Sequence, residues 1–276
     1  MKIKMSNAGL NPTRTMEVMD HTGEIREVGV ASEYPLTIKV DGQEIVTLMT
    51  IGTNPEELAL GYLRNQKLMD DIDDIAEVMV DWTHETAEIK THGHKAPLDI
   101  ESKLSTRIVT SGCGQGTLFS CSLDKLYEVD LPRLKVLQSH VYSLLKGLAK
   151  RNEVYRRAGS VHACALCEKN KVLIFIEEVG RHNATDAISG RMWIRNISGR
   201  DKMLYTTGRV TSEIVIKAAQ MGISVLISKS GITNMALELA RDLKMTIIGR
   251  AKQSRFLVFH GRENVVLDQL PEDCQL

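Results

Sequence analysis

The sequence predicts a mixed α/β protein with a small mixed domain at residues 1–130 and an α/β domain at residues 131–276. Three observations support this fold class. A chain of 276 residues is long enough to bury a substantial core in two domains. Residues 34–91 show strand-like alternation around one helical segment. Beyond residue 137, short runs rich in Val and Ile alternate with helical patterns, which predicts a mostly parallel sheet with helices on both faces.

The N-terminal half begins with residues 1–30, which show little periodicity and predict a loose lead-in. Alternating apolar residues at 36–40, the turn Asp41-Gly42 and the apolar run Ile45–Met49 predict a β-hairpin. Asn54 is the expected cap of a helix that starts at Pro55. Two further strands are expected at 75–80 and 86–91.

The second half starts with a helix of about four turns, indicated by the 3.6-residue spacing of apolar residues from Leu137 to Leu148. Strands and helices are then expected in regular alternation. The expected strands are 172–176, 203–205, 225–227, 246–248 and 256–259. The expected helices are 182–194, 209–221 and 233–243.

The composition excludes several classes of protein. The 35 basic residues balance the 35 acidic ones, so no global charge favours nucleic acid or an anionic membrane as partner. No apolar run is long enough to span a bilayer, and the expectation is a cytoplasmic protein. The five cysteines are Cys113, Cys121, Cys164, Cys167 and Cys274, an odd number that favours thiol chemistry or metal binding over a disulfide scaffold.

Cys113 lies between glycines in the segment Arg107–Thr117, after a short β-prone run. Small neighbours allow a large partner to approach the sulfur, and the nearby Arg107 favours the reactive thiolate. The alternative is a loop cysteine without a role, and the residues alone leave both interpretations open.

Four segments that follow the expected strands contain small or polar residues and at least one cation. They are Gly180–Asn183, Thr207–Arg209, Ser228–Gly231 and Arg250–Arg255. In a parallel sheet these segments meet at one edge, where helix N-termini offer N–H groups to phosphate. The sequence therefore predicts a site for a ligand with more than one phosphate, although any single arginine is more often a solvated surface charge.

The pair Cys164 and Cys167 forms a CxxC motif with His162 close by. A zinc site needs about four ligands, and no second CxxC is present. A zinc deaminase would also need a glutamate after His162 and a proline before Cys164, and both are missing. A redox pair and structural thiols remain the two interpretations. His84, His92 and His94 are expected to be surface histidines.

Several motifs occur together in order along residues 33–260. They are RIVTSGCG at Arg107–Gly114, GSVHACA at Gly159–Ala165, EVGRHNA at Glu178–Ala184, GRVTSE at Gly208–Glu213, SKSGIT at Ser228–Thr233 and the stretch Gly249–Phe256. Together they resemble the FdhD/NarQ family, sulfur carrier proteins needed for formate dehydrogenase activity. The resemblance implies a cytidine-deaminase-like, three-layer α/β/α C-terminal domain without deaminase chemistry.

The resemblance also implies a sulfurtransferase function. A cysteine desulfurase would load sulfur onto Cys113 as a persulfide, which would pass to the molybdenum of bis-molybdopterin guanine dinucleotide (bis-MGD) for formate dehydrogenase. No tightly held metal is implied, and a homodimer is compatible with the resemblance. By motif, the cofactor-binding residues are Arg250, Ala251, Lys252, Gln253, Ser254 and Arg255, with Arg181 and Arg209 as further phosphate contacts.

One position departs from the family pattern. The family loop usually reads C-G-x-C-G, and Gly116 occupies the place of the second cysteine here. The favoured hypothesis is that Cys113 carries sulfur alone, with Cys121 or the pair Cys164 and Cys167 as other candidates for a second thiol. A chaperone that binds bis-MGD and moves no sulfur is the alternative function.

Overall fold

The computed structural model describes residues 3–93 and 129–269. Within them the chain divides into two compact units. Unit 1 contains residues 3–93, 152–162 and 177–195, and unit 2 contains residues 129–151, 163–176 and 196–269. The units are therefore interleaved along the chain, whereas the sequence suggested a single boundary at residue 130.

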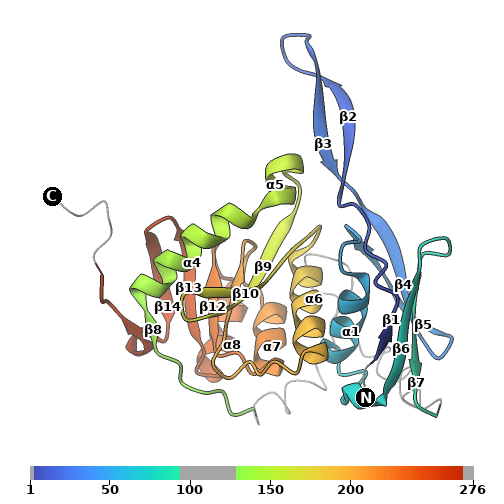
Figure 1. Ribbon diagram of the computed structural model, residues 1–276. Helices are drawn as coiled ribbons and strands as arrows, with labels where there is room; N and C mark the ends of the chain where they lie inside the picture. Colours follow the sequence, from blue (N-terminus) through green and yellow to red (C-terminus); the bar gives the residue numbers. More distant parts are fainter. Residues whose placement is uncertain (1–2, 94–128, 270–276) are drawn as a thin grey trace. The chain divides into compact units, whose positions relative to one another are not determined.

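Unit 1 contains a five-stranded sheet in the order β1-β6-β7-β4-β5 (Figure 1). Its strands are β1 Lys4–Met5, β4 Tyr34–Val40, β5 Gln43–Thr50, β6 Ile75–Asp81 and β7 Thr86–Thr91, and the short helix η1 Ile72–Asp74 precedes β6. The predicted β4–β5 hairpin is confirmed. Asp41 and Gly42 have φ angles of 47° and 85°, as a tight turn between twisted strands requires.

The prediction that residues 1–30 form a loose lead-in is wrong. Residues in this region form β2 Thr13–Met19 and β3 Ile25–Ala31, paired antiparallel in a separate two-stranded sheet, here called the arm (Figure 1). Most of its side chains are exposed on both faces. Apolar residues alternate over only three positions on each strand, Met16 to Val18 and Val28 to Val30, a run shorter than the roughly four to eight residues that indicate a strand.

Two helices of unit 1, α1 Pro55–Asn65 and α6 Arg181–Ile194, pack at very close range. A Cβ atom at Gly61 would lie 1.7 Å from the carbonyl oxygen of Asp186, and one at Gly190 would lie 1.9 Å from that of Glu57. Glycine at both positions thus allows backbone-to-backbone contact. The Asn65 amide donates to the Asp186 carboxylate at 2.7 Å, which satisfies polar groups at this buried crossing.

The short helix α5 Glu153–Ala158 also belongs to unit 1 and has no counterpart among the expected elements. The backbone N–H groups of Val154 and Tyr155 donate to the buried carboxylate of Glu177, each at 2.9 Å. A carboxylate at the start of a helix satisfies N–H groups that have no partner within the helix and interacts favourably with its dipole.

Unit 2 is organised around a six-stranded sheet in the order β10-β9-β11-β12-β13-β14. The strands are β9 His162–Glu168, β10 Lys171–Glu178, β11 Met203–Thr206, β12 Val225–Ser228, β13 Thr246–Lys252 and β14 Arg255–His260, with the outer ends of β9 and β10 assigned to unit 1. The central strands β11, β12 and β13 are parallel, and β9 and β14 pair antiparallel with them. The mixed α/β fold class is confirmed, with its parallel part at the centre of the sheet.

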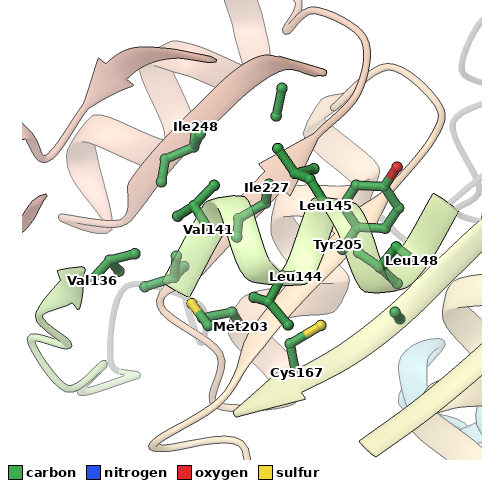
Figure 2. Packing of buried hydrophobic residues seen from close by; sticks show 13 residues of the cluster. Val136, Val141, Leu144, Leu145, Leu148, Cys167, Met203, Tyr205, Ile227 and Ile248 are labelled. Atoms are coloured by element: carbon green, nitrogen blue, oxygen red, sulfur yellow. The ribbon is translucent and has the colours of Figure 1, made fainter. Parts of the chain in front are cut away.

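Three helices cover this sheet: α4 Gln138–Arg151, α7 Ser212–Gln220 and α8 Asn234–Asp242. Figure 2 shows α4 lying over one face of the sheet, where its apolar side chains meet those of alternate strand residues. The cluster includes Val141, Leu144, Leu145, Leu148, Cys167, Met203, Tyr205, Ile227 and Ile248. The residues between them on the strands, such as Leu204 and Leu226, are also fully buried, and α8 contacts β13 and β14. Unit 2 thus has helices on both faces of its sheet.

Two short pieces complete unit 2. The strands β8 Val136–Leu137 and β15 Val265–Val266 pair parallel, and η2 Arg262–Asn264 precedes β15. Of the helices in residues 3–93 and 129–269, none combines the length and the apolar character needed to cross a bilayer.

Candidate functional site

The candidate site lies at the edge of the unit 2 sheet where the three parallel strands end. The segments after β11, β12 and β13 are Thr207–Arg209, Ser228–Gly231 and Arg250–Arg255. Since parallel strands end at the same edge, these three expected segments come together as predicted. The fourth, Gly180–Asn183, belongs to unit 1 and lies at the start of α6.

Backbone hydrogen bonds join the three segments to one another. The Lys229 N–H donates to the Thr206 carbonyl at 3.0 Å, and the Val210 N–H donates to the Gly231 carbonyl at 2.9 Å. The Arg250 N–H donates to the Ser230 carbonyl at 2.6 Å. The segments therefore form one connected surface, since each is held at a fixed distance from the next.

Buried hydroxyl groups support this surface from below. The Ser228 hydroxyl donates to the Gly208 carbonyl at 2.7 Å and accepts from the Ser230 N–H at 3.0 Å. The Thr206 hydroxyl accepts from the Gly208 N–H at 3.1 Å. Thr206 and Ser228 are fully buried, so their hydrogen bonds are protected from water and fix the shape of both turns.

The segment Arg250–Arg255, which lies between the expected strands 246–248 and 256–259, forms a tight hairpin. Arg250 to Lys252 end β13, Arg255 begins β14, and Lys252 pairs with Arg255. Arg250 and Gln253 have φ angles of 52° and 55°, a region that non-glycine residues seldom occupy. Such strain persists where the surroundings enforce it, and it is common at functional sites. The hydrogen bond from the Arg250 N–H to the Ser230 carbonyl helps to hold Arg250 in this conformation.

Five cations are exposed on these segments, and together they are called the basic edge: Arg209, Lys229, Arg250, Lys252 and Arg255. No ion pair joins Arg209, Arg250 or Lys252 to another residue of the described part. The basic edge is thus an excess of positive charge on a chain whose net charge is zero. Such a local excess attracts anions such as phosphate groups.

Two helices start beside the basic edge and add backbone donors. Thr211 and Thr233 are the N-cap residues of α7 and α8, and neither side chain makes a capping hydrogen bond. The first N–H groups of a helix have no acceptor within it, and the dipole gives this end a partial positive charge. The arrangement of cations and helix starts is suited to an anionic ligand with several phosphates.

Cys113, the expected carrier thiol, lies outside the described residues, as do Cys121, Cys274 and His94. Cys164 and Cys167 are fully buried on β9. Cys167 contacts the α4 core (Figure 2), and Cys164, three residues earlier on the strand, points to the opposite face. Burial raises the pKa of Cys167 to about 12. These properties favour structural thiols over a redox pair.

A polar cluster in unit 1 was not expected from the sequence. The Glu178 carboxyl is buried and accepts from the Thr50 hydroxyl, from the Ile51 N–H at 3.2 Å and from the Val179 N–H at 3.1 Å. Burial, only partly offset by these hydrogen bonds, raises its pKa to about 7. No sequence signal distinguishes this glutamate from a solvated one, because its partners are supplied by a strand more than a hundred residues earlier.

Arg181 belongs to the same unit and is buried at the start of α6, unlike the exposed Arg209 of unit 2. The pKa of the neighbouring His162 is lowered, first by burial and second by the charge of Arg181. His84 and His92 are exposed as expected. In the described residues, no three His, Cys, Asp or Glu side chains gather as they would around a metal ion.

Comparison with known proteins relates the chain to one family. The model of the FdhD/NarQ family matches residues 31–266. The sulfur carrier protein FdhD of Bacillus subtilis is 31% identical over 246 residues, which cover 88% of this chain and 93% of that protein. The protein of the same name from Staphylococcus aureus strain MRSA252 is 30% identical over 237 residues, 85% of this chain and 88% of the relative.

A solved structure has the same fold. It is the crystal structure of a protein proposed to be a formate dehydrogenase accessory protein, from Desulfotalea psychrophila. The TM-score is 0.72 with 22% identity, and the match covers 92% of this chain and 98% of the other.

Proposed function

Because the chain belongs to the FdhD/NarQ family, we propose that it is a sulfur carrier that serves formate dehydrogenase. It receives sulfur from a cysteine desulfurase as a persulfide on Cys113 and transfers it to the molybdenum of bis-MGD. The observation that carries this proposal is the family match over residues 31–266, together with relatives that are named sulfur carriers.

The chemistry requires a thiolate and an accessible sulfur. In the loading step the Cys113 thiolate attacks the terminal sulfur of the desulfurase persulfide and displaces the cysteine thiolate of that enzyme. In the delivery step the S–S bond breaks and its electron pair stays on the Cys113 thiolate, while the terminal sulfur becomes sulfide by taking two electrons from the substrate's molybdenum, which would enter as Mo(IV) and leave as Mo(VI). Arg107 and the glycines around Cys113 are compatible with both steps.

The basic edge supports bis-MGD as the substrate. Each guanine dinucleotide arm of this molecule carries a pyrophosphate group. The basic edge offers five cations on segments that are joined by backbone hydrogen bonds and held by buried hydroxyl groups. Arginine binds phosphate oxygens through two parallel N–H groups. Arg250, Lys252 and Arg255 are therefore expected to hold the phosphates, and the backbone from Ala251 to Ser254 shapes the turn between them.

The decisive experiment follows labelled sulfur. The protein is incubated with a cysteine desulfurase and ³⁵S-cysteine, and the label is located by peptide mass spectrometry. One added sulfur on the Cys113 peptide is expected, with none after Cys113→Ala substitution. The matched control, Cys121→Ala, should retain the label. Label on Cys164 or Cys167, or full loading of the Cys113→Ala variant, would contradict the assignment.

A second function, a bis-MGD chaperone without sulfur transfer, is favoured by Gly116 at the position of the second family cysteine. It requires the basic edge and not Cys113. If the Cys113→Ala variant still supports full formate dehydrogenase activity in cells while an Arg250→Ala variant does not, the chaperone function replaces sulfur transfer.

A further inference from the structure

The side chain of Ser228 connects all three segments of the basic edge. It lies at the end of β12 and is fully buried. Its hydroxyl donates to the Gly208 carbonyl at 2.7 Å and accepts from the Ser230 N–H at 3.0 Å. The Ser230 carbonyl in turn accepts from the Arg250 N–H at 2.6 Å. A continuous chain of hydrogen bonds therefore runs through this hydroxyl, from the turn that carries Arg209 to the hairpin that carries Arg250.

Arg209 lies between two fixed backbone positions. On one side, the Gly208 carbonyl is held by the Ser228 hydroxyl. On the other side, Val210 makes backbone hydrogen bonds of 2.9 and 3.0 Å with the residues directly before α8. The bonds of Val210 involve backbone groups alone, which almost any residue supplies. The bond at Gly208 needs a side-chain hydroxyl, so it depends on the identity of residue 228.

Burial makes the Ser228 hydroxyl difficult to replace. An alanine at this position would leave the Gly208 carbonyl without this donor and the Ser230 N–H without this acceptor. Polar groups that lose a partner in a buried place carry a desolvation cost, so the two turns would shift toward other partners. The backbone bonds of β11, β12 and β13 remain in that variant. The expected change is therefore in the distance between Arg209 and Arg250, with the sheet intact.

The distance between these two cations decides which anions bind well. A ligand with two linked phosphates can contact the Arg209 turn and the Arg250 hairpin at once. Its second contact then forms within the complex, and its strength depends on how well the two positions match the ligand. A single phosphate can be bound by one side alone. A hydroxyl that fixes the distance should therefore affect the two classes of ligand differently.

We propose that Ser228 is a positioning residue. It holds Arg209 at the distance from Arg250 that suits two linked phosphates, so that the basic edge prefers a pyrophosphate group to a single phosphate. The inference rests on one part of the proposed function, the assignment of the basic edge as the phosphate site, and does not depend on sulfur transfer by Cys113.

The test compares guanosine diphosphate with guanosine monophosphate, each titrated into the full chain in a calorimeter. The wild type should bind the diphosphate roughly tenfold more tightly than the monophosphate. Ser228→Ala should weaken binding of the diphosphate roughly tenfold and binding of the monophosphate less than about twofold. A substitution that merely damaged the edge would weaken both ligands alike, so the ratio of the two affinities reports on positioning.

Ser224 provides the matched control. It directly precedes β12 at the opposite end of the strand, roughly 13 Å from Ser228. It is also buried, and its hydroxyl makes no hydrogen bond within the residues that the structure describes. Ser224→Ala thus makes the same change in a buried serine of the same sheet. It should bind both nucleotides like the wild type.

Two further variants test the route through Arg209. In an Arg209→Ala background, adding Ser228→Ala should weaken binding of the diphosphate by less than about twofold, because the cation to be positioned is gone. Ser228→Cys has a similar volume but a thiol, which is a weaker donor and acceptor than a hydroxyl. Its preference for the diphosphate should lie between those of the wild type and Ser228→Ala, and it provides the comparison if the alanine variant does not fold.

Each contrary result has a distinct meaning. If the wild type binds neither nucleotide, the basic edge is not a phosphate site, and both this inference and the proposed cofactor site are wrong. If the wild type prefers the diphosphate and Ser228→Ala or Ser228→Cys retains the full preference, the positioning role alone is wrong and the proposed function stands. Equal weakening of both nucleotides, or independent effects of Ser228→Ala and Arg209→Ala, would also overturn the positioning role.

Discussion

At the scale of single residues, the buried carboxyl of Glu178 makes the stability of the fold depend on pH. Its pKa is about 7 in the folded protein and near 4.5 in an unfolded chain, because burial favours the neutral carboxyl. Between these values the folded state binds more protons than the unfolded one, so stability falls as pH rises. The raised pKa of Glu178 therefore stabilises the folded state fully below about pH 4.5. This stabilisation, roughly 3 kcal/mol in total, is lost as the pH rises through 7.

The measurement is urea unfolding at pH 5.5 and pH 8. Trp82 and Trp193, the two tryptophans of the chain, both lie in unit 1 with Glu178, so tryptophan fluorescence reports on that unit. Glu178→Gln should flatten the pH dependence, whereas Glu44→Gln, at an exposed position, should retain it. An unchanged pH profile in Glu178→Gln would show that other groups control the stability of unit 1.

The buried thiols give a second prediction at this scale. Cys164 and Cys167 should resist iodoacetamide in the native protein at pH 8, because both are inaccessible and burial keeps the Cys167 thiol protonated. In urea both should react. Peptide mapping before and after unfolding provides the comparison, and rapid native alkylation of either cysteine would reopen the possibility of a redox pair.

The sequence predicted which residue types line the basic edge, because small and cationic residues after parallel strands follow a general rule. It did not predict Glu178, since a buried carboxyl is identified by its surroundings and not by its neighbours in sequence. Cys113 stays a prediction, as do bis-MGD, the desulfurase, the cytidine-deaminase-like domain and a cytoplasmic location.

At the scale of elements, the crossing of α1 and α6 depends on two glycines. Gly61→Ala or Gly190→Ala would place a methyl group within 2 Å of a backbone carbonyl oxygen, so the helices must separate. The expected loss of stability is about 3 kcal/mol or more, measured by tryptophan fluorescence in urea. Gly147→Ala is the control, followed by circular dichroism because α4 belongs to unit 2; nothing lies within 4 Å of a Cβ there, and alanine should stabilise α4 by up to about 1 kcal/mol. A loss below 1 kcal/mol in both crossing variants would mean that the helices adapt easily.

Most elements with a buried face were predicted within a few residues, but the buried strand β9 was not among the expected strands. The helices α4, α7 and α8 have apolar stripes that face the core, so their spacing is visible in the sequence. The arm has no core face and was expected to be irregular. The hairpin between β13 and β14 turns at Gln253 and Ser254 without glycine or asparagine, so no typical turn residues indicated it.

At the scale of the whole molecule, a net charge of zero conceals a separation of charge, with cations on the basic edge of unit 2 and carboxylates on the arm of unit 1. The basic edge should bind guanosine diphosphate more weakly as salt increases. Arg250→Ala and Arg255→Ala should each weaken binding about tenfold and reduce the salt dependence, as measured by calorimetry. Lys150→Ala, at the exposed end of α4, should bind like the wild type. Equal affinity in all four proteins would place the phosphate site elsewhere.

The interleaving of the two units has a consequence for protein synthesis. The segment that carries α1 leaves the ribosome early, but its packing partner α6 emerges more than a hundred residues later. At translation rates of about 5–20 residues per second, this delay is on the order of ten seconds. During that time the side of α1 that contains Gly61 and Asn65 has no α6 to pack against on the nascent chain. We therefore expect this interval, rather than any feature of the finished protein, to be the period in which the chain most needs a chaperone.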